Sequence, residues 1–154
     1  GPVYMRFGRL AVPVINDETT YKFEIGKGVE LRPGKDITII ATGLPVSESL
    51  EAAKMLAEDG IDAQVINIHT IKPLDEELVV KAAQATGRVF TVEEHSIIGG
   101  LGSAVMECLA EKNPVKVTRI GVRDTFGESG PAKDLLHKYE LDAEGIYKQI
   151  KAAL

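Results

Sequence analysis

Apolar residues follow two alternating patterns along this chain from residue 36 to its end. Short runs rich in β-branched residues have the length and composition of strands. Between these runs, apolar residues recur three or four positions apart, which is typical of helices with one buried face. The runs predict four strands, at residues 37–41, 63–68, 88–93 and 115–122.

The residues that border the helical segments favour helix ends. Proline is well tolerated in the first helical turn, and an aspartate side chain can accept hydrogen bonds from the first free N–H groups. We therefore expect four helices to start near Pro45, Asp75, Pro131 and Asp142. A fifth predicted helix follows the glycine-rich turn at residues 99–102.

The order of these elements predicts the fold class. Strands and helices alternate along residues 36–154, which implies an α/β fold of three layers, a mostly parallel twisted sheet with helices on both faces. The strands are largely apolar, as expected when both faces of a sheet are covered. Gly145 lies inside the last predicted helix, where glycine costs about 1 kcal/mol relative to alanine, so we expect close packing there.

The first 35 residues have no clear hydrophobic period. Two short segments, Val3–Phe7 and Tyr21–Ile25, have a β-like composition, and Arg32–Lys35 has the composition of a turn. We interpret residues 1–35 as a linking arm and residues 36–154 as the domain. Because the chain begins with glycine and proline, we expect it to be part of a longer polypeptide.

The composition indicates a globular protein and argues against several classes. Hydrophobic residues make up 44% of the 154 residues and charged residues 27%, which argues against disorder. No apolar run approaches the ~18 residues that a membrane span needs. The net charge of −5 argues against nucleic acid and anionic membranes as partners, because both favour clustered Lys and Arg. The single cysteine, Cys108, excludes an internal disulfide and fits a reducing cytoplasm.

The glycine-rich segment between the third strand and its helix is a candidate anion site. Its residues are Gly99, Gly100, Leu101, Gly102 and Ser103. Glycines at a helix start let backbone N–H groups approach a phosphate. The spacing fits neither a dinucleotide fingerprint nor a P-loop, because no third glycine and no Lys-Ser/Thr pair follow. A tight turn with close packing is therefore favoured over an anion site.

Other candidate chemistry is sparse. His95 follows Glu93 and Glu94 near a strand end, where sites gather in α/β folds, and could be an acid, a base or a subunit contact. A solvated or interface histidine is favoured, because no nucleophile or second partner is evident. The histidines and Cys108 lack the spacing of metal ligands, so we expect no metal site and no catalytic residue.

Two arginines near the start of the chain are candidate phosphate ligands. Arg6 and Arg9 are three positions apart, and an arginine side chain can bind a phosphate with two parallel hydrogen bonds. The alternative is a pair of solvated surface arginines, which composition alone favours.

Several segments, in order, resemble the transketolase family. The matching segments are Gly1–Arg9, Ile39–Gly43, Thr70–Asp75, Thr91–His95, Gly99–Val105, Asp124–Gly130 and Leu141–Ile146. The first resembles the last strand of the family's middle, pyrimidine-binding domain, and the others resemble its C-terminal domain. The segment at 99–105 is most similar to transketolases that are split into two chains, so the chain resembles a split transketolase C-terminal subunit.

The resemblance implies a parent enzyme that transfers a two-carbon ketol unit between sugar phosphates. Thiamine diphosphate and a divalent metal ion would sit between the first two domains of a homodimer. The chain itself would be structural and dimerising, inactive alone and without bound cofactor, with N-terminal transketolase domains or a separate subunit as its partner. Arg9 matches a family arginine that contacts substrate phosphate, and Arg6 has a counterpart in deoxyxylulose phosphate synthases.

Three other interpretations stay open at this point. The parent could be a 2-oxoacid dehydrogenase, with this chain in its β subunit, or a deoxyxylulose phosphate synthase, since both share the domain. The chain could instead be a stand-alone module that binds a nucleotide or another anion at Gly99–Ser103. An independent flavodoxin-like carrier is the third interpretation.

Overall fold

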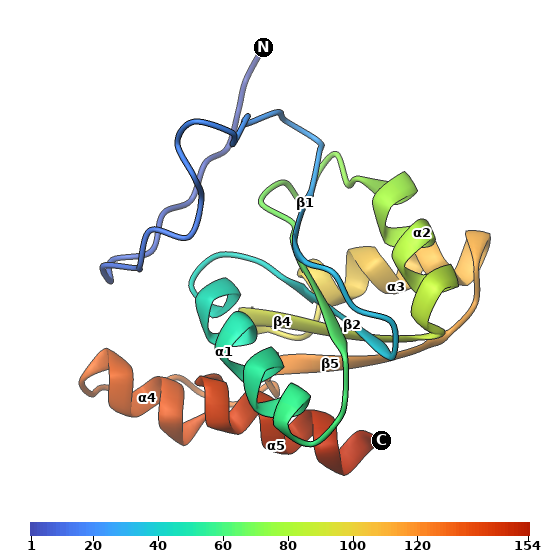
Figure 1. Cartoon of the computed structure of the whole chain (residues 1–154). Coiled ribbons are helices and arrows are strands. Elements are labelled where there is room, and N and C mark those ends of the chain that lie inside the picture. Colours follow the sequence, from blue (N-terminus) through green and yellow to red (C-terminus); the bar gives the residue numbers. More distant parts are fainter.

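Five strands form a single sheet in a computed structural model that describes residues 1–154 (Figure 1). The strands are β1 (Val29–Arg32), β2 (Ile37–Ala41), β3 (Ala63–Asn67), β4 (Arg88–Ser96) and β5 (Lys116–Val122). The helices are α1 (Pro45–Glu58), α2 (Glu76–Thr86), α3 (Leu101–Lys112), α4 (Ala132–Lys138) and α5 (Ala143–Ala153). The spatial order is β1-β3-β2-β4-β5, with β2 to β5 parallel and β1 antiparallel to β3.

Helices cover both faces of this sheet, which confirms the predicted three-layer α/β fold (Figure 1). Neighbouring strand residues point to opposite faces. Ile39 and Phe90 therefore lie in a core with α1, α4 and α5, whereas Ile40 and Val89 lie in a second core with α2 and α3. Because both faces are buried, the central strands read as continuous apolar runs in the sequence.

The predicted helix starts are confirmed, and two are capped by side chains. Asp75 accepts a hydrogen bond from the N–H of Leu78 at 3.2 Å, and Asp142 accepts one from the N–H of Gly145 at 2.9 Å. Each bond satisfies an N–H group that the helix itself leaves unpaired. None of the five helices is both long and apolar enough to cross a membrane.

The N-terminal region differs from the expectation. Neither Val3–Phe7 nor Tyr21–Ile25 forms a strand, and the strand of this region is instead Val29–Arg32, in β1. A strand needs a partner, and β1 has one in β3, with Val29 opposite Asn67. The two expected segments pair with no strand. The first 35 residues therefore contribute the edge strand of the sheet.

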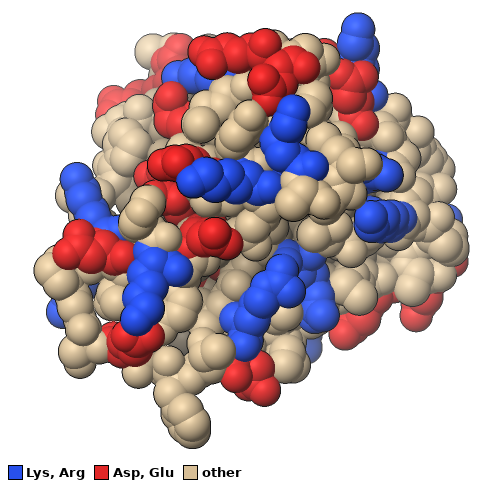
Figure 2. Space-filling view, turned by 90° about the horizontal axis from the view of Figure 1, so that it is seen from below, with Lys and Arg blue, Asp and Glu red and all other residues tan.

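The face formed by α4 and α5 carries charges of both signs. Figure 2 shows this face from below the view of Figure 1, with acidic and basic side chains interspersed. Lys148 pairs with Glu144 at 2.6 Å, and Lys138 pairs with Glu128 at 2.5 Å. Exposed pairs of this kind contribute little to stability, typically below about 1 kcal/mol each.

The junction between α4 and α5 is expected to be pH-sensitive. His137 Nδ1 lies 2.7 Å from Asp142 Oδ2, and this hydrogen bond raises the pKa of His137 above its ordinary value of 6.5. Burial of Asp142 opposes its ionisation, but hydrogen bonds from His137 and from the Gly145 N–H outweigh burial and lower its pKa below 3.8. The pair therefore stabilises the fold at pH values that lie between the pKa of Asp142 and the pKa of His137.

The stabilisation by His137 is present below pH 6.5 and is lost as the pH rises through its raised pKa. The contribution of Asp142 is lost as the pH falls below 3.8 through its lowered pKa. Thermal unfolding from pH 5 to 9 should show the wild-type melting temperature falling more steeply on the alkaline side than that of His137→Gln. Parallel profiles for the two proteins would contradict this expectation.

Candidate functional site

The glycine-rich turn closes around a buried carboxylate. Glu93 is 1% exposed and lies on β4, one strand residue before Glu94. Its Oε2 accepts a hydrogen bond from the N–H of Leu101 at 2.9 Å, and its Oε1 accepts one from Gly102 at 2.8 Å. These N–H groups belong to the first turn of α3, the end of the helix that attracts negative charge. Glu93 thus occupies the place that a bound phosphate takes in a phosphate-binding turn.

The glycines are needed because this turn is packed so closely. A Cβ on Gly100 would lie 2.0 Å from Glu93 Oε2, and a Cβ on Gly102 would lie 2.8 Å from Thr91 Oγ1. Gly99 has φ +76°, a conformation that side chains rarely adopt, and its N–H donates to Ser103 Oγ at 2.8 Å. This geometry favours the tight-turn interpretation of Gly99–Ser103, and binding of an external anion there stays a prediction.

Sequence reasoning identified this turn but not the residue that fills it. The available signal for Glu93 was an otherwise apolar strand, followed by a helix that begins without a Ser, Thr, Asp or Asn cap. A carboxylate at the end of such a strand is well placed to receive the unpaired N–H groups of the next helix. Glu93 therefore has a structural role that its sequence position alone did not reveal.

The segment after Glu93 is fixed by contacts with β5. The N–H of Ile97 donates to the carbonyl of Val122 at 3.0 Å, and Arg119 Nη1 donates to the carbonyl of Ile97 at 2.7 Å. A Cβ on Gly121 would lie 2.8 Å from the carbonyl oxygen of His95, so the two strands approach closely here. The backbone around His95, at the carboxyl end of β4, is therefore held against β5.

Two of the sequence-predicted site residues meet at this position. Arg6 Nη1 lies 3.2 Å from His95 Nδ1, although the residues are 89 positions apart. The same nitrogen of His95 lies against the carbonyl of Glu94. Arg9 makes no hydrogen bond or ion pair in this structure, so the structure joins Arg6 to His95 but not to Arg9.

The remaining candidate residues have local roles. His69 Nε2 lies 3.2 Å from the carbonyl oxygen of Glu24, and its ring packs on Phe23 with centroids 4.8 Å apart. His137 pairs with Asp142 at the junction of α4 and α5. Burial raises the pKa of the Cys108 thiol, which keeps it protonated and unreactive.

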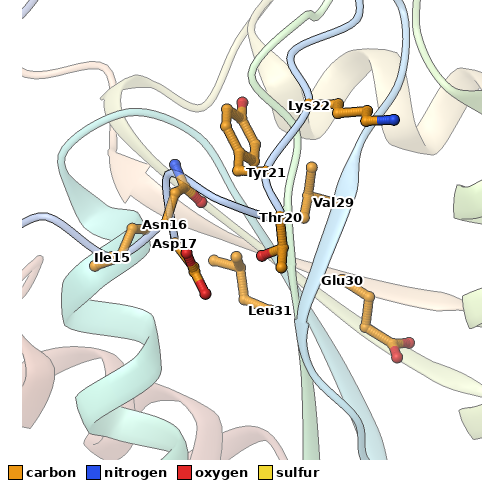
Figure 3. Close-up of a pocket in the computed structure, with 9 residues that line it drawn as sticks. All are labelled: Ile15, Asn16, Asp17, Thr20, Tyr21, Lys22, Val29, Glu30 and Leu31. Atoms are coloured by element: carbon orange, nitrogen blue, oxygen red, sulfur yellow. The ribbon is translucent and has the colours of Figure 1, made fainter.

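A shallow pocket of about 330 Å³ lies between residues 15–22 and β1 (Figure 3). Its lining residues are Ile15, Asn16, Asp17, Thr20, Tyr21, Lys22, Val29, Glu30 and Leu31. Asp17 is already engaged, because the hydroxyl and N–H of Thr19 donate to it and lower its pKa. Glu30 accepts a hydrogen bond from the side-chain amide of Gln64. Its acidic side chains are therefore held by neighbouring residues, and the pocket contains no catalytic arrangement.

Comparisons with known proteins agree on one family. The model described as "Transketolase, C-terminal domain" matches residues 26–146. The 6-deoxy-6-sulfo-D-fructose transketolase subunit of Clostridium sp. (strain MSTE9) is 50% identical over 96% of this chain and 46% of its own length. A putative transketolase C-terminal section of Methanocaldococcus jannaschii is 49% identical over 97% of this chain and 47% of its own length.

A solved structure gives the same result. A split-gene transketolase, described as an inactive beta4 tetramer, is 48% identical and superposes with a TM-score of 0.89 over 95% of this chain and 48% of its own. The chain therefore spans about half the length of the relatives that it matches.

Proposed function

The chain belongs to the transketolase family, and from this we propose that it is the C-terminal domain of an enzyme that transfers a two-carbon ketol unit between sugar phosphates. The observation that carries the proposal is the likeness to split-transketolase subunits, at about half identical residues over nearly the whole chain. Within the parent enzyme, the chain is a structural and dimerising domain.

The residues of this chain do not fit thiamine diphosphate and its metal ion. No group of three or more His, Cys, Asp or Glu side chains is placed to hold a metal. The turn at Gly99–Ser103, which could take a diphosphate, is closed around the carboxylate of Glu93. We therefore assign the cofactor and its chemistry to other domains of the parent enzyme.

Exposed apolar residues support the assignment of residues 1–35 to a boundary between domains. Val3, Tyr4, Met5 and Phe7 are all exposed, and Phe7 retains 82% of its accessible surface. Clustered apolar side chains in water usually mark a contact with another protein surface. We propose that this arm continues a preceding pyrimidine-binding domain and that residues 36–154 form the C-terminal domain, with β1 of the arm added to the edge of its sheet.

The same proposal covers the site, the partners and the compartment. Arg9 and Arg6 contact the phosphate of the substrate in the assembled enzyme. The chain works with N-terminal transketolase domains or a separate N-terminal subunit, in a homodimer of the parent. The single cysteine fits a cytoplasmic enzyme.

The isolated chain is expected to show no transketolase activity, because it lacks the groups that hold the cofactor. Ketol transfer from xylulose 5-phosphate to ribose 5-phosphate should appear only when the missing domains, thiamine diphosphate and Mg²⁺ are supplied. A coupled assay that follows glyceraldehyde 3-phosphate measures both cases. Turnover by the isolated chain, free of contaminating enzyme, would refute the structural role. An assembled enzyme that binds the cofactor but transfers no ketol unit would refute the proposed reaction.

A further inference from the structure

The arm is fastened to the domain at one short turn just before β1. The N–H of Lys27 donates to the carbonyl of Glu24 at 3.2 Å, which closes a turn over residues 24–27. Gly26, the third residue of this turn, has φ +83°, a conformation that favours glycine. A Cβ on Gly26 would lie 3.0 Å from Pro73 Cγ. The turn therefore packs directly on the connection between β3 and α2.

The side chain of His69, just after β3, holds this turn from the domain side. Its Nε2 lies 3.2 Å from the same carbonyl oxygen of Glu24. A carbonyl oxygen only accepts, so Nε2 carries the proton and donates it. The imidazole ring also packs on Phe23, with the ring centroids 4.8 Å apart. The carbonyl of Glu24 thus accepts one hydrogen bond from within the turn and a second from the domain.

A second attachment follows at Gly28. Its N–H donates to Asp75 Oδ2 at 3.0 Å, while Asp75 Oδ1 caps α2 by accepting from the N–H of Leu78. Asp75 is buried, and Lys27 Nζ lies 3.9 Å from its Oδ1. A Cβ on Gly28 would lie 2.5 Å from Ile68 Cδ1, so the backbone passes very close to the domain. One buried carboxylate therefore joins the arm to the start of α2.

The part of the arm before this turn is held less firmly. Residues 10–22 run beside the domain (Figure 1), and Leu10 and Ile15 pack against its core. The hydrogen bonds of this stretch stay within it, between Asp17 and residues 19–21. None of them joins the stretch to the domain. A segment with few buried contacts and no hydrogen bonds to its neighbours opens at a lower free energy than one that has both.

We propose that residues 24–28 form a clasp that ends a hinge at residues 10–22, and that His69 keeps this clasp closed. Movement of a preceding domain then bends the chain at residues 10–22 and leaves β1 and α2 in place. The proposal rests on the proposed function only in requiring a domain before the arm. It goes beyond that function by locating the hinge and by giving His69 a conformational role.

Hydrogen–deuterium exchange of the full-length subunit, followed by mass spectrometry, tests the clasp. Peptides that cover residues 24–28 should exchange at least about tenfold more slowly than peptides from residues 10–16. His69→Phe keeps an aromatic ring against Phe23 but removes the donor. Exchange at residues 24–28 should therefore rise about five- to tenfold, as expected for the loss of one hydrogen bond. His69→Gln keeps a side-chain N–H and should restore most of the protection.

The rise in exchange must be local if His69 acts on the clasp. Exchange in α5 should stay unchanged in His69→Phe, and His137→Phe, the same substitution on α4, should leave residues 24–28 as in the wild type. The proposal is overturned by equal exchange of residues 10–16 and 24–28 in the wild type, by no change in His69→Phe, or by an equal rise in α5. None of these measurements depends on turnover, so the clasp and the proposed ketol transfer are tested separately.

Discussion

Glu93→Ala is expected to lower the free energy of unfolding by about 3–5 kcal/mol. The substitution leaves the N–H groups of Leu101 and Gly102 without their acceptors in a buried position. Each buried donor left unpaired costs about 1–3 kcal/mol, and the lost side chain leaves a cavity as well. Urea unfolding followed by circular dichroism measures the change.

Two further variants make this expectation specific. Glu93→Gln keeps the volume and one acceptor oxygen, so it should lose about half as much stability as Glu93→Ala. Glu94→Ala removes the neighbouring, more exposed carboxylate and should change stability by less than about 0.5 kcal/mol. If the free energy of unfolding of Glu93→Ala lies within about 1 kcal/mol of the wild-type value, the carboxylate does not hold the start of α3.

Gly145→Ala should lower the free energy of unfolding by about 2 kcal/mol, although alanine is the better helix former. A Cβ at this position would lie 2.4 Å from the Cα of Glu140 and 2.6 Å from its carbonyl oxygen. These are backbone atoms, so α5 must shift away from Glu140 in the connection between α4 and α5. Insertion of a methyl group into a packed site costs about 1–3 kcal/mol. The upper end applies here because the contacting atoms are backbone atoms, and the gain of about 1 kcal/mol in helix propensity leaves a net loss of about 2 kcal/mol.

Gly127→Ala is the matched control for this substitution. No atom lies within 4 Å of a Cβ at Gly127, and its φ is not in the left-handed region. The same chemical change should therefore leave stability within about 0.5 kcal/mol of the wild type. Equal melting temperatures for the two variants would show that Gly145 is not closely packed, contrary to the expectation from its place in a helix.

Most of the fold could be predicted from the sequence because its signals are local. The β-branched runs of β2 to β5 and the capping residues Asp75 and Asp142 specify their own elements, and the structure places each near its expected position. The arm could not be predicted in this way. Val3–Phe7 has strand-like composition but no partner, whereas β1 is weakly patterned and is stabilised by pairing with β3.

The candidate site was less predictable than the fold. A glycine pattern specifies the path of the backbone but not the group that fills the turn, so it did not predict the role of Glu93. Arg6 and His95 were each candidates, but they are 89 residues apart and no periodicity relates them. Such contacts depend on how the arm crosses the domain, which local sequence patterns do not encode.

The division of the core between two faces has a consequence for synthesis on the ribosome. The face under α2 and α3 is built from helices in the middle of the chain. The other face needs α1, near the start of the domain, and α5, whose Ile146 and Ile150 are fully buried in it. While α5 is still inside the exit tunnel, the part of this face that α5 covers stays open to solvent, although α1 can already pack on the sheet. This apolar surface becomes buried only when α5 emerges and packs on it.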